Sequence, residues 1–219
     1  MIGNFKVEIN EKIYLRNPDD TALGRKIIRV GIQLIEELGF ESFTFKKLAE
    51  QIQSTEASVY RYFENKHKFL VYIINLYWYN LSYQIDYQCN NIENKELRLK
   101  QTIRTISEFP NDANNVEMNI LHKIVVSESP KAYHTKYVDE DNQDGFFRSY
   151  KSLCKKIADS IKEVFPSHPY SLALSSTLLE TSHLQIHFSK HLPSLTEVRL
   201  ENENHTSLNN FLDFLVFGK

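Results

Sequence analysis

The chain has 219 residues, enough for one or two domains with a substantial buried core. Hydrophobic residues make up 42% of it and charged residues 25%, which is ordinary for a globular protein, and the net charge of −2 does not indicate nucleic acid by itself. No apolar run approaches the roughly 18 residues of a membrane span, and the N-terminus lacks the apolar core of a signal peptide.

Cysteine usage points to a reducing compartment. Cys89 and Cys154 are far apart in the sequence and are expected to remain thiols. We therefore expect a cytoplasmic protein of bacterial type with no membrane partner.

The N-terminal region predicts an arm followed by a helix. Residues 1 to 18 have a mixed composition and end at Pro18, and a helix should begin after Asp20, a good cap, and end at Leu38 before Gly39. Apolar residues at spacings of three and four line one face of this helix. They are Leu23, Ile27, Val30, Leu34 and Leu38.

Two short helices are predicted next. Thr44 precedes the first and Thr55 the second, and each hydroxyl can cap free backbone N–H groups. Only Gln53 and Ser54 separate the helices, so the chain must turn sharply there. This arrangement is typical of a helix-turn-helix, which lays its second helix in a DNA major groove.

A long helix is predicted from Lys66 to about Cys89. It is apolar nearly all round, which indicates burial on both faces. This helix would link a second core to the predicted helix-turn-helix region before it, which we call the head. Polar residues from Lys131 to Asp144 predict a loop. Further helices are expected at about 95 to 109, 113 to 128, 143 to 165, 169 to 191 and 205 to 217.

The segment from Gly39 to Leu70 resembles the N-terminal domain of TetR-family transcriptional regulators, and the resemblance covers roughly residues 21 to 70. Its most specific part is the run Tyr-Arg-Tyr-Phe-Glu-Asn-Lys at positions 60 to 66. The resemblance implies an all-α fold with a three-helix helix-turn-helix DNA-binding domain over residues 1–66. A helical ligand-binding and dimerisation domain would follow over residues 67–219. The family pattern matches Gly39-Phe40, Thr44, Leu48-Ala49, Thr55, Tyr60, Tyr62-Phe63, Lys66 and Leu70.

Two departures from the family pattern fall at the turn. The family usually has Gly then Val where this chain has Gln53 and Ser54, and a left-handed Gln would cost on the order of 1 kcal/mol. Glu56 would repel phosphates unless it accepts a bond from a cytosine amino group.

Double-stranded DNA is the first expected partner. Residues 1–66 contain ten Lys/Arg and ten Asp/Glu, so the cations must be arranged to face phosphates, and one head should bind weakly. Hydroxyl and ammonium groups would contact the DNA backbone, and Arg61 could bridge guanine O6 and N7. The residues expected to contact DNA are Thr44, Lys46, Thr55, Ala57, Ser58, Tyr60, Arg61, Tyr62 and Lys66.

A small-molecule effector is the second expected partner, because proteins of this family usually bind one among the helices after the head. Aromatic rings on the long helix could line such a site, although the same rings could instead fill a helical core. These rings belong to Tyr72, Trp78, Tyr79, Tyr83 and Tyr87.

A histidine row and the lack of enzyme motifs complete the survey. His183, His187 and His191 recur every four residues, a spacing that can hold a metal, but no acidic residue within the run completes a site. No phosphate-binding loop or hydrolase motif is found, so no enzyme, cofactor or metal is predicted. A metal-dependent enzyme built on these histidines is one alternative.

We therefore expect a ligand-responsive repressor that binds a palindromic operator as a homodimer. A ligand-binding or protein-interaction module that has lost DNA binding is the second alternative, suggested by Gln53, Ser54, Glu56 and the balanced charge. Dimerisation is expected through the helices at 169 to 191 and 205 to 217. The apolar residues expected there are Leu172, Leu178, Leu179, Leu184, Leu208, Phe211, Leu212 and Leu215.

Overall fold

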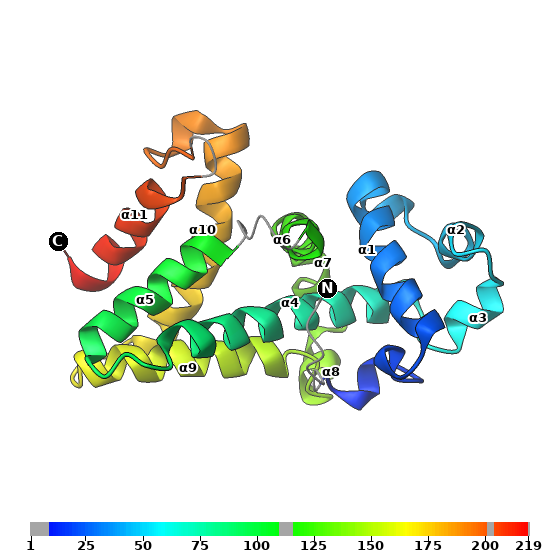
Figure 1. Ribbon diagram of the computed structural model, residues 1–219, viewed down its shortest axis with the longest axis horizontal. Coiled ribbons are helices and arrows are strands. Elements are labelled where there is room, and N and C mark those ends of the chain that lie inside the picture. Colours follow the sequence, from blue (N-terminus) through cyan, green and yellow to red (C-terminus); the bar gives the residue numbers. More distant parts are fainter. Residues whose placement is uncertain (1–8, 110–115, 201–203, 219) are drawn as a thin grey trace. The chain divides into compact units, whose positions relative to one another are not determined.

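A computed structural model describes residues 9–109, 116–200 and 204–218, and every regular element longer than one residue in these ranges is helical (Figure 1). The expected all-α fold is confirmed. The chain forms two compact units: the first comprises residues 1–78 and 113–149, and the second comprises residues 79–112 and 150–219. These units are defined by packing alone, so the functional division at residue 66 stays a prediction.

Helix α1 (Ala22–Ser42) starts and stops for identifiable local reasons. Its cap is Thr21 rather than the expected Asp20, because the Thr21 side chain accepts a bond from the Gly24 N–H at 2.9 Å. Gly39 interrupts the helix with φ of 74°, as its predicted role as a stop requires, and one further turn follows.

The helix-turn-helix consists of α2 (Phe45–Gln51) and α3 (Glu56–Tyr60), and both predicted caps are confirmed. Thr44 Oγ1 accepts from Lys47 N at 3.2 Å, and Thr55 Oγ1 accepts from Ser58 N at 3.3 Å. Gln53 has φ of 56°, the one positive φ among the described non-glycine residues, which confirms the left-handed turn position.

Aromatic packing holds this head together. Phe69 in α4 (Lys66–Cys89) has no exposed surface, and its ring stacks on Phe43 with centroids 5.3 Å apart. Phe63 meets the Phe69 ring edge-on at 5.1 Å. Gly31 of α1 makes room for it, since a Cβ there would lie 2.3 Å from the Phe69 ring. The segment after α3 is therefore fixed on a rigid aromatic base.

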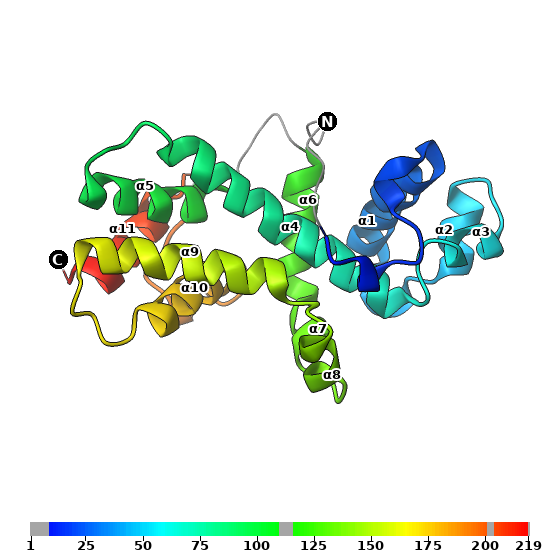
Figure 2. The ribbon, with the colours of Figure 1, turned by 90° about the horizontal axis from the view of Figure 1, so that it is seen from below.

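The rest of the first unit corrects one expectation. The segment from Lys131 to Asp144 is not simply a loop, because Pro130 begins one short helix and two turns of another follow. Residues 113–115 of the expected helix at 113 to 128 and residues 1–8 of the arm lie outside the described ranges. The remaining helices of the unit are α6 (Val116–Glu128), α7 (Pro130–Tyr133) and α8 (Val138–Gln143), seen also in Figure 2.

The second unit contains the helices expected at about 95 to 109, 143 to 165, 169 to 191 and 205 to 217, with bounds within a few residues of those predicted. Leu178, Leu179, Leu208 and Leu212 are fully buried inside it, because α10 and α11 pack on each other and on α5. These four leucines have no surface left to contact another chain. They therefore drop out of the eight residues expected at the dimer interface. The helices are α5 (Lys95–Glu108), α9 (Arg148–Val164), α10 (Ser171–His191) and α11 (Thr206–Phe217).

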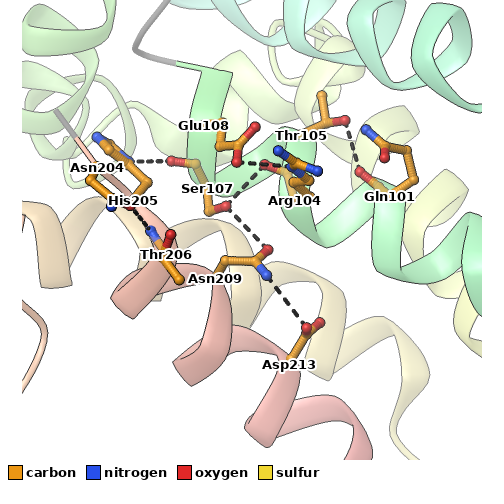
Figure 3. Close-up of polar contacts among 10 residues, drawn as sticks. All are labelled: Gln101, Arg104, Thr105, Ser107, Glu108, Asn204, His205, Thr206, Asn209 and Asp213. Carbon is orange, nitrogen blue, oxygen red and sulfur yellow. Dashed lines mark hydrogen bonds and ion pairs between the residues drawn. The ribbon is translucent and has the colours of Figure 1, made fainter.

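A polar seam joins α5 to α11 in this unit (Figure 3). The Ser107 carbonyl bonds to the buried His205 ring, and the Ser107 hydroxyl donates to Asn209 Oδ1 at 3.3 Å. Asn209 Nδ2 in turn donates to Asp213 at 3.4 Å, and burial raises the pKa of that carboxyl. Directional bonds of this kind fix the pairing of two helices more tightly than leucine contacts alone.

The cysteines and the apolar lengths of the helices can be described for the same ranges. Cys89 and Cys154 are both buried free thiols, and burial raises the pKa of Cys154 to about 11. No described helix has the length and apolarity needed to cross a membrane.

Candidate nucleic-acid interface

The outer face of the helix-turn-helix is exposed and chemically suited to DNA. Ala57 and Arg61 are exposed on and directly after α3, and Tyr60 is 46% exposed with its ring edge-on to Phe45 at 5.1 Å. Lys46 on α2 is exposed as well. A small residue, a phenol and a guanidinium on one short helix can approach and read base edges.

The caps contribute hydroxyl groups to this face. Thr44 and Thr55 are exposed at the N-termini of their helices, where partial positive charge and free N–H groups favour a phosphate. Ser58 is half-buried, and its hydroxyl bonds to that of Thr55 at 2.8 Å, so its main contact is with the cap.

Tyr62 does not lie on the exposed face. It is 2% exposed, and its hydroxyl bonds to Thr21 Oγ1 at 2.7 Å. This position does not support its expected contact with DNA, because the Tyr62 side chain points towards Thr21 at the start of α1. Tyr62 instead fixes the end of α3 through its bond to Thr21. Because Thr21 is distant in sequence, no local sequence pattern indicates this role.

Lys66 is also engaged by the protein. Its ammonium donates to the carbonyls of Phe40 and Glu41, each at 3.2 Å, and lies 4.7 Å from the centroid of the Phe40 ring. It therefore stabilises the last turn of α1. A phosphate would have to compete with these bonds.

Charge around the two short helices is balanced. Lys46, Lys47 and Arg61 are exposed, but the exposed carboxylates Glu50 and Glu56 lie on the same helices. Lys47 also donates to the Ser42 carbonyl at 2.8 Å. A single head therefore offers few unopposed cations, and its affinity for DNA should be low.

The expected effector residues are divided between the two units. Tyr72 belongs to the first unit, where it is 2% exposed and packs edge-on against Phe63 at 5.3 Å. Trp78 is 1% exposed and donates from Nε1 to the Tyr133 hydroxyl at 2.8 Å. Both rings are buried in the core, and their expected place beside a ligand stays a prediction.

The other three rings belong to the second unit. Tyr79 and Tyr83 are half-buried, while Tyr87 is 67% exposed and stacks on Tyr83 with centroids 6.5 Å apart. Their role in ligand binding stays a prediction. An open pocket of about 420 Å³ occurs elsewhere in this unit, and its lining residues are of polar types and include no aromatic ring. It is lined by Arg199, Asn204, Thr206, Ser207 and Asn210.

The histidine row does not share one environment. His183 is buried and its pKa falls to about 4 through desolvation, whereas His187 and His191 are exposed with ring centroids 4.8 Å apart. Each four-residue step advances about 40° around a helix, which carries the later rings away from the core. Within the described ranges, no three His, Cys, Asp or Glu side chains are grouped closely enough to hold a metal.

Comparison with known proteins agrees with this geometry. Residues 27–73 match the family model described as "Bacterial regulatory proteins, tetR family", which contains α2, α3 and the start of α4. A comparison with curated protein sequences finds no match.

Solved structures with a similar fold extend over most of the chain. The fatty acid degradation regulator FadR from Bacillus halodurans is 18% identical with a TM-score of 0.63, and covers 89% of this chain and 98% of its own. AibR, solved in complex with isovaleryl coenzyme A and operator DNA, is 15% identical with a TM-score of 0.61, covering 88% and 97%. The TetR family regulator PfmR from Thermus thermophilus is 12% identical with a TM-score of 0.60, covering 91% and 97%. At these identities the likeness concerns the fold.

Proposed function

We propose that this TetR-family protein is a transcriptional repressor that binds a palindromic operator as a homodimer and is released by a small molecule. One observation carries the proposal: α3 begins at the Thr55 cap after a sharp turn, carries exposed Ala57 and Tyr60, and is followed directly by exposed Arg61. Its inner side chain Val59 is fully buried, so the helix is held rigidly while its outer face is free to enter a major groove.

We expect dimerisation because the cations and carboxylates of one head are balanced, so that a single head should bind DNA weakly. Two heads joined in one molecule bind successive major grooves about 34 Å apart, and the second contact becomes intramolecular. Apolar side chains that stay exposed support a surface for the second copy: Leu172 at 59% and Leu184 at 48% on α10, and Phe214 at 55% on α11. Leu172 and Leu184 thus remain expected contacts, and Phe214 is added to them.

Release requires that an effector change the head, and contacts within the first unit offer a route. Glu128 at the end of α6 accepts from the Phe40 N–H at 3.4 Å, and Lys131 bridges Glu128 and Glu41 at 2.7 and 3.2 Å. A shift of α6 would pull on the end of α1, which also holds Lys66. A few kcal/mol of differential affinity would be enough to favour release. The acyl coenzyme A bound by AibR is a reasonable first compound to screen.

The proposal is tested by DNA titration with three variants. Lys46→Ala should weaken binding to every sequence and lower the salt dependence, because a phosphate contact is lost. Arg61→Ala should relax base preference and cost about 1–3 kcal/mol on the preferred operator, because a base contact is lost. Lys155→Ala removes an exposed lysine of α9 in the second unit and serves as the matched control.

Fluorescence anisotropy with labelled duplexes measures all three variants. If the folded, dimeric protein does not bind duplex DNA even at low salt, the alternative of a module that has lost DNA binding is favoured instead. If Arg61→Ala and Lys155→Ala lose equal amounts of DNA affinity, Arg61 does not contact the bases.

A further inference from the structure

The segment before α1 is part of the first unit rather than a loose tail. Residues 9 to 21, which we call the strap, are drawn in dark blue in Figure 1. Ile9 and Ile13 are 6% and 1% exposed, so the strap is anchored by buried apolar side chains. Burial of these two isoleucines removes apolar surface from water and so holds the strap against the first unit.

Polar contacts fix the first half of the strap. Asn10 Nδ2 donates to the Asp144 carbonyl at 2.6 Å, and Lys12 Nζ lies 2.6 Å from Asp144 Oδ1. Lys68, in the first turn of α4, donates to the Lys12 carbonyl at 2.9 Å. The strap is thus bound both to the turn after α8 and to the helix that follows the head.

The second half of the strap is bound to the end of the recognition helix. The Leu15 N–H donates to the Tyr62 carbonyl at 2.8 Å, and Thr21 bonds to the Tyr62 hydroxyl at 2.7 Å. Close packing also fixes Pro18, since a Cβ on Gly24 would lie 2.2 Å from its carbonyl oxygen. Both halves therefore leave the intervening residues little freedom.

Arg16 lies between these anchors and is exposed. Its guanidinium carbon is 5.6 Å from the centroid of the Tyr62 ring, two residues beyond the end of α3. Among the described residues Arg16 forms no ion pair, although Asp19 and Asp20 follow it in the strap. An arginine held against an aromatic ring keeps its charge and can present its N–H fork to a phosphate.

We propose that Arg16 binds a phosphate of the operator beside the bases read by α3, and that the strap sets its position. This inference rests on the proposed DNA-binding function. The partner is duplex DNA, since the guanidinium lies against Tyr62, just past the end of the helix expected in the major groove. It adds an exposed cation beside two short helices on which the exposed cations and carboxylates are balanced. The contact is independent of sequence, and it fixes how the head sits on the duplex.

The test measures affinity and salt dependence on a mixed-sequence duplex at low salt, using the full chain. Arg16→Ala should bind about tenfold more weakly, and the slope of log K against log salt should fall by about 0.9 for each head. Arg16→Lys should keep the slope and lose only part of the affinity, since the charge remains but the fork is lost. Arg104→Ala, an exposed arginine of α5 in the second unit, is the matched control and should leave both values unchanged.

A variant of the anchor separates the contact from its positioning. Asp144→Ala removes the partner of Lys12 but leaves Arg16 in place, and should weaken binding less than Arg16→Ala does. The double variant should bind no more weakly than Arg16→Ala alone, because the anchor acts through Arg16. Trp78 fluorescence during unfolding checks that the first unit is intact in each variant, and Arg16→Gln should repeat the loss if Arg16→Ala is unstable.

The outcomes distinguish this inference from the function on which it rests. If the wild-type protein binds DNA and Arg16→Ala behaves like Arg104→Ala, the strap contact is wrong while the repressor proposal stands. Additive losses in the double variant would overturn the positioning role of the strap. A wild-type protein that does not bind DNA overturns both.

Discussion

Replacing Phe69 by alanine is expected to lower the free energy of unfolding of the first unit by about 3–5 kcal/mol. The Phe69 ring is fully buried and contacts Phe43, Phe45 and Phe63, which come from both sides of the helix-turn-helix. Gly31 packs beneath it and has no side chain to fill the cavity. Urea unfolding followed by the fluorescence of Trp78, which belongs to the same unit, measures the change.

A control on the same helix isolates the effect of burial. Tyr87→Ala removes a ring that is 67% exposed and should cost within about 0.5 kcal/mol. DNA affinity should fall together with stability in Phe69→Ala, because both α2 and the segment after α3 rest on this ring. A loss of stability below about 1 kcal/mol would mean that the aromatic base does not hold the head.

Lowering the pH from 6.5 to 4 is expected to destabilise the second unit by up to about 3 kcal/mol through His183. Burial lowers the pKa of this histidine from 6.5 to about 4, so the unfolded chain binds a proton in this range that the folded chain does not. Stability is therefore unaffected by His183 above pH 6.5, falls as the pH drops, and levels off below about 4. Urea unfolding at several pH values, followed by circular dichroism, measures the slope.

Two variants separate this histidine from other titrating groups. His183→Leu should flatten the pH dependence between 6.5 and 4, because the neutral side chain fits a buried site without a proton to gain. His187→Leu changes an exposed histidine one turn later on α10 and should leave the slope as it is. Equal slopes for wild-type protein and His183→Leu would contradict the assignment.

Local sequence signals predicted the head well because they act over a few residues. Thr44 and Thr55 cap their helices through their own side chains, and Gly39 stops α1 through its own backbone conformation. Gln53 takes the left-handed conformation that a turn between such close helices demands. The bounds of α4 also follow directly from its long apolar pattern.

Which side chains are buried and which are exposed was predicted less well. Apolar residues at the same helical spacing occur in a core, at an interface or around a ligand. Tyr62 and Tyr72 match patterns that fit DNA or ligand contact, yet tertiary packing buries both. Leu178 on α10 and Leu212 on α11 have the same spacing as residues that remain exposed, and only the packing of these helices with α5 tells them apart. The strap was missed because its anchors, such as Asp144, are distant in sequence.

Selection from a pool of random duplex DNA tests the central claim most directly. Purified wild-type protein at moderate salt should enrich a palindromic site whose half-sites are about one helical turn apart, and Arg61→Ala should enrich it less sharply. Sedimentation of the selected complex should give one dimer per site. A folded protein that enriches no motif through repeated rounds would contradict the account.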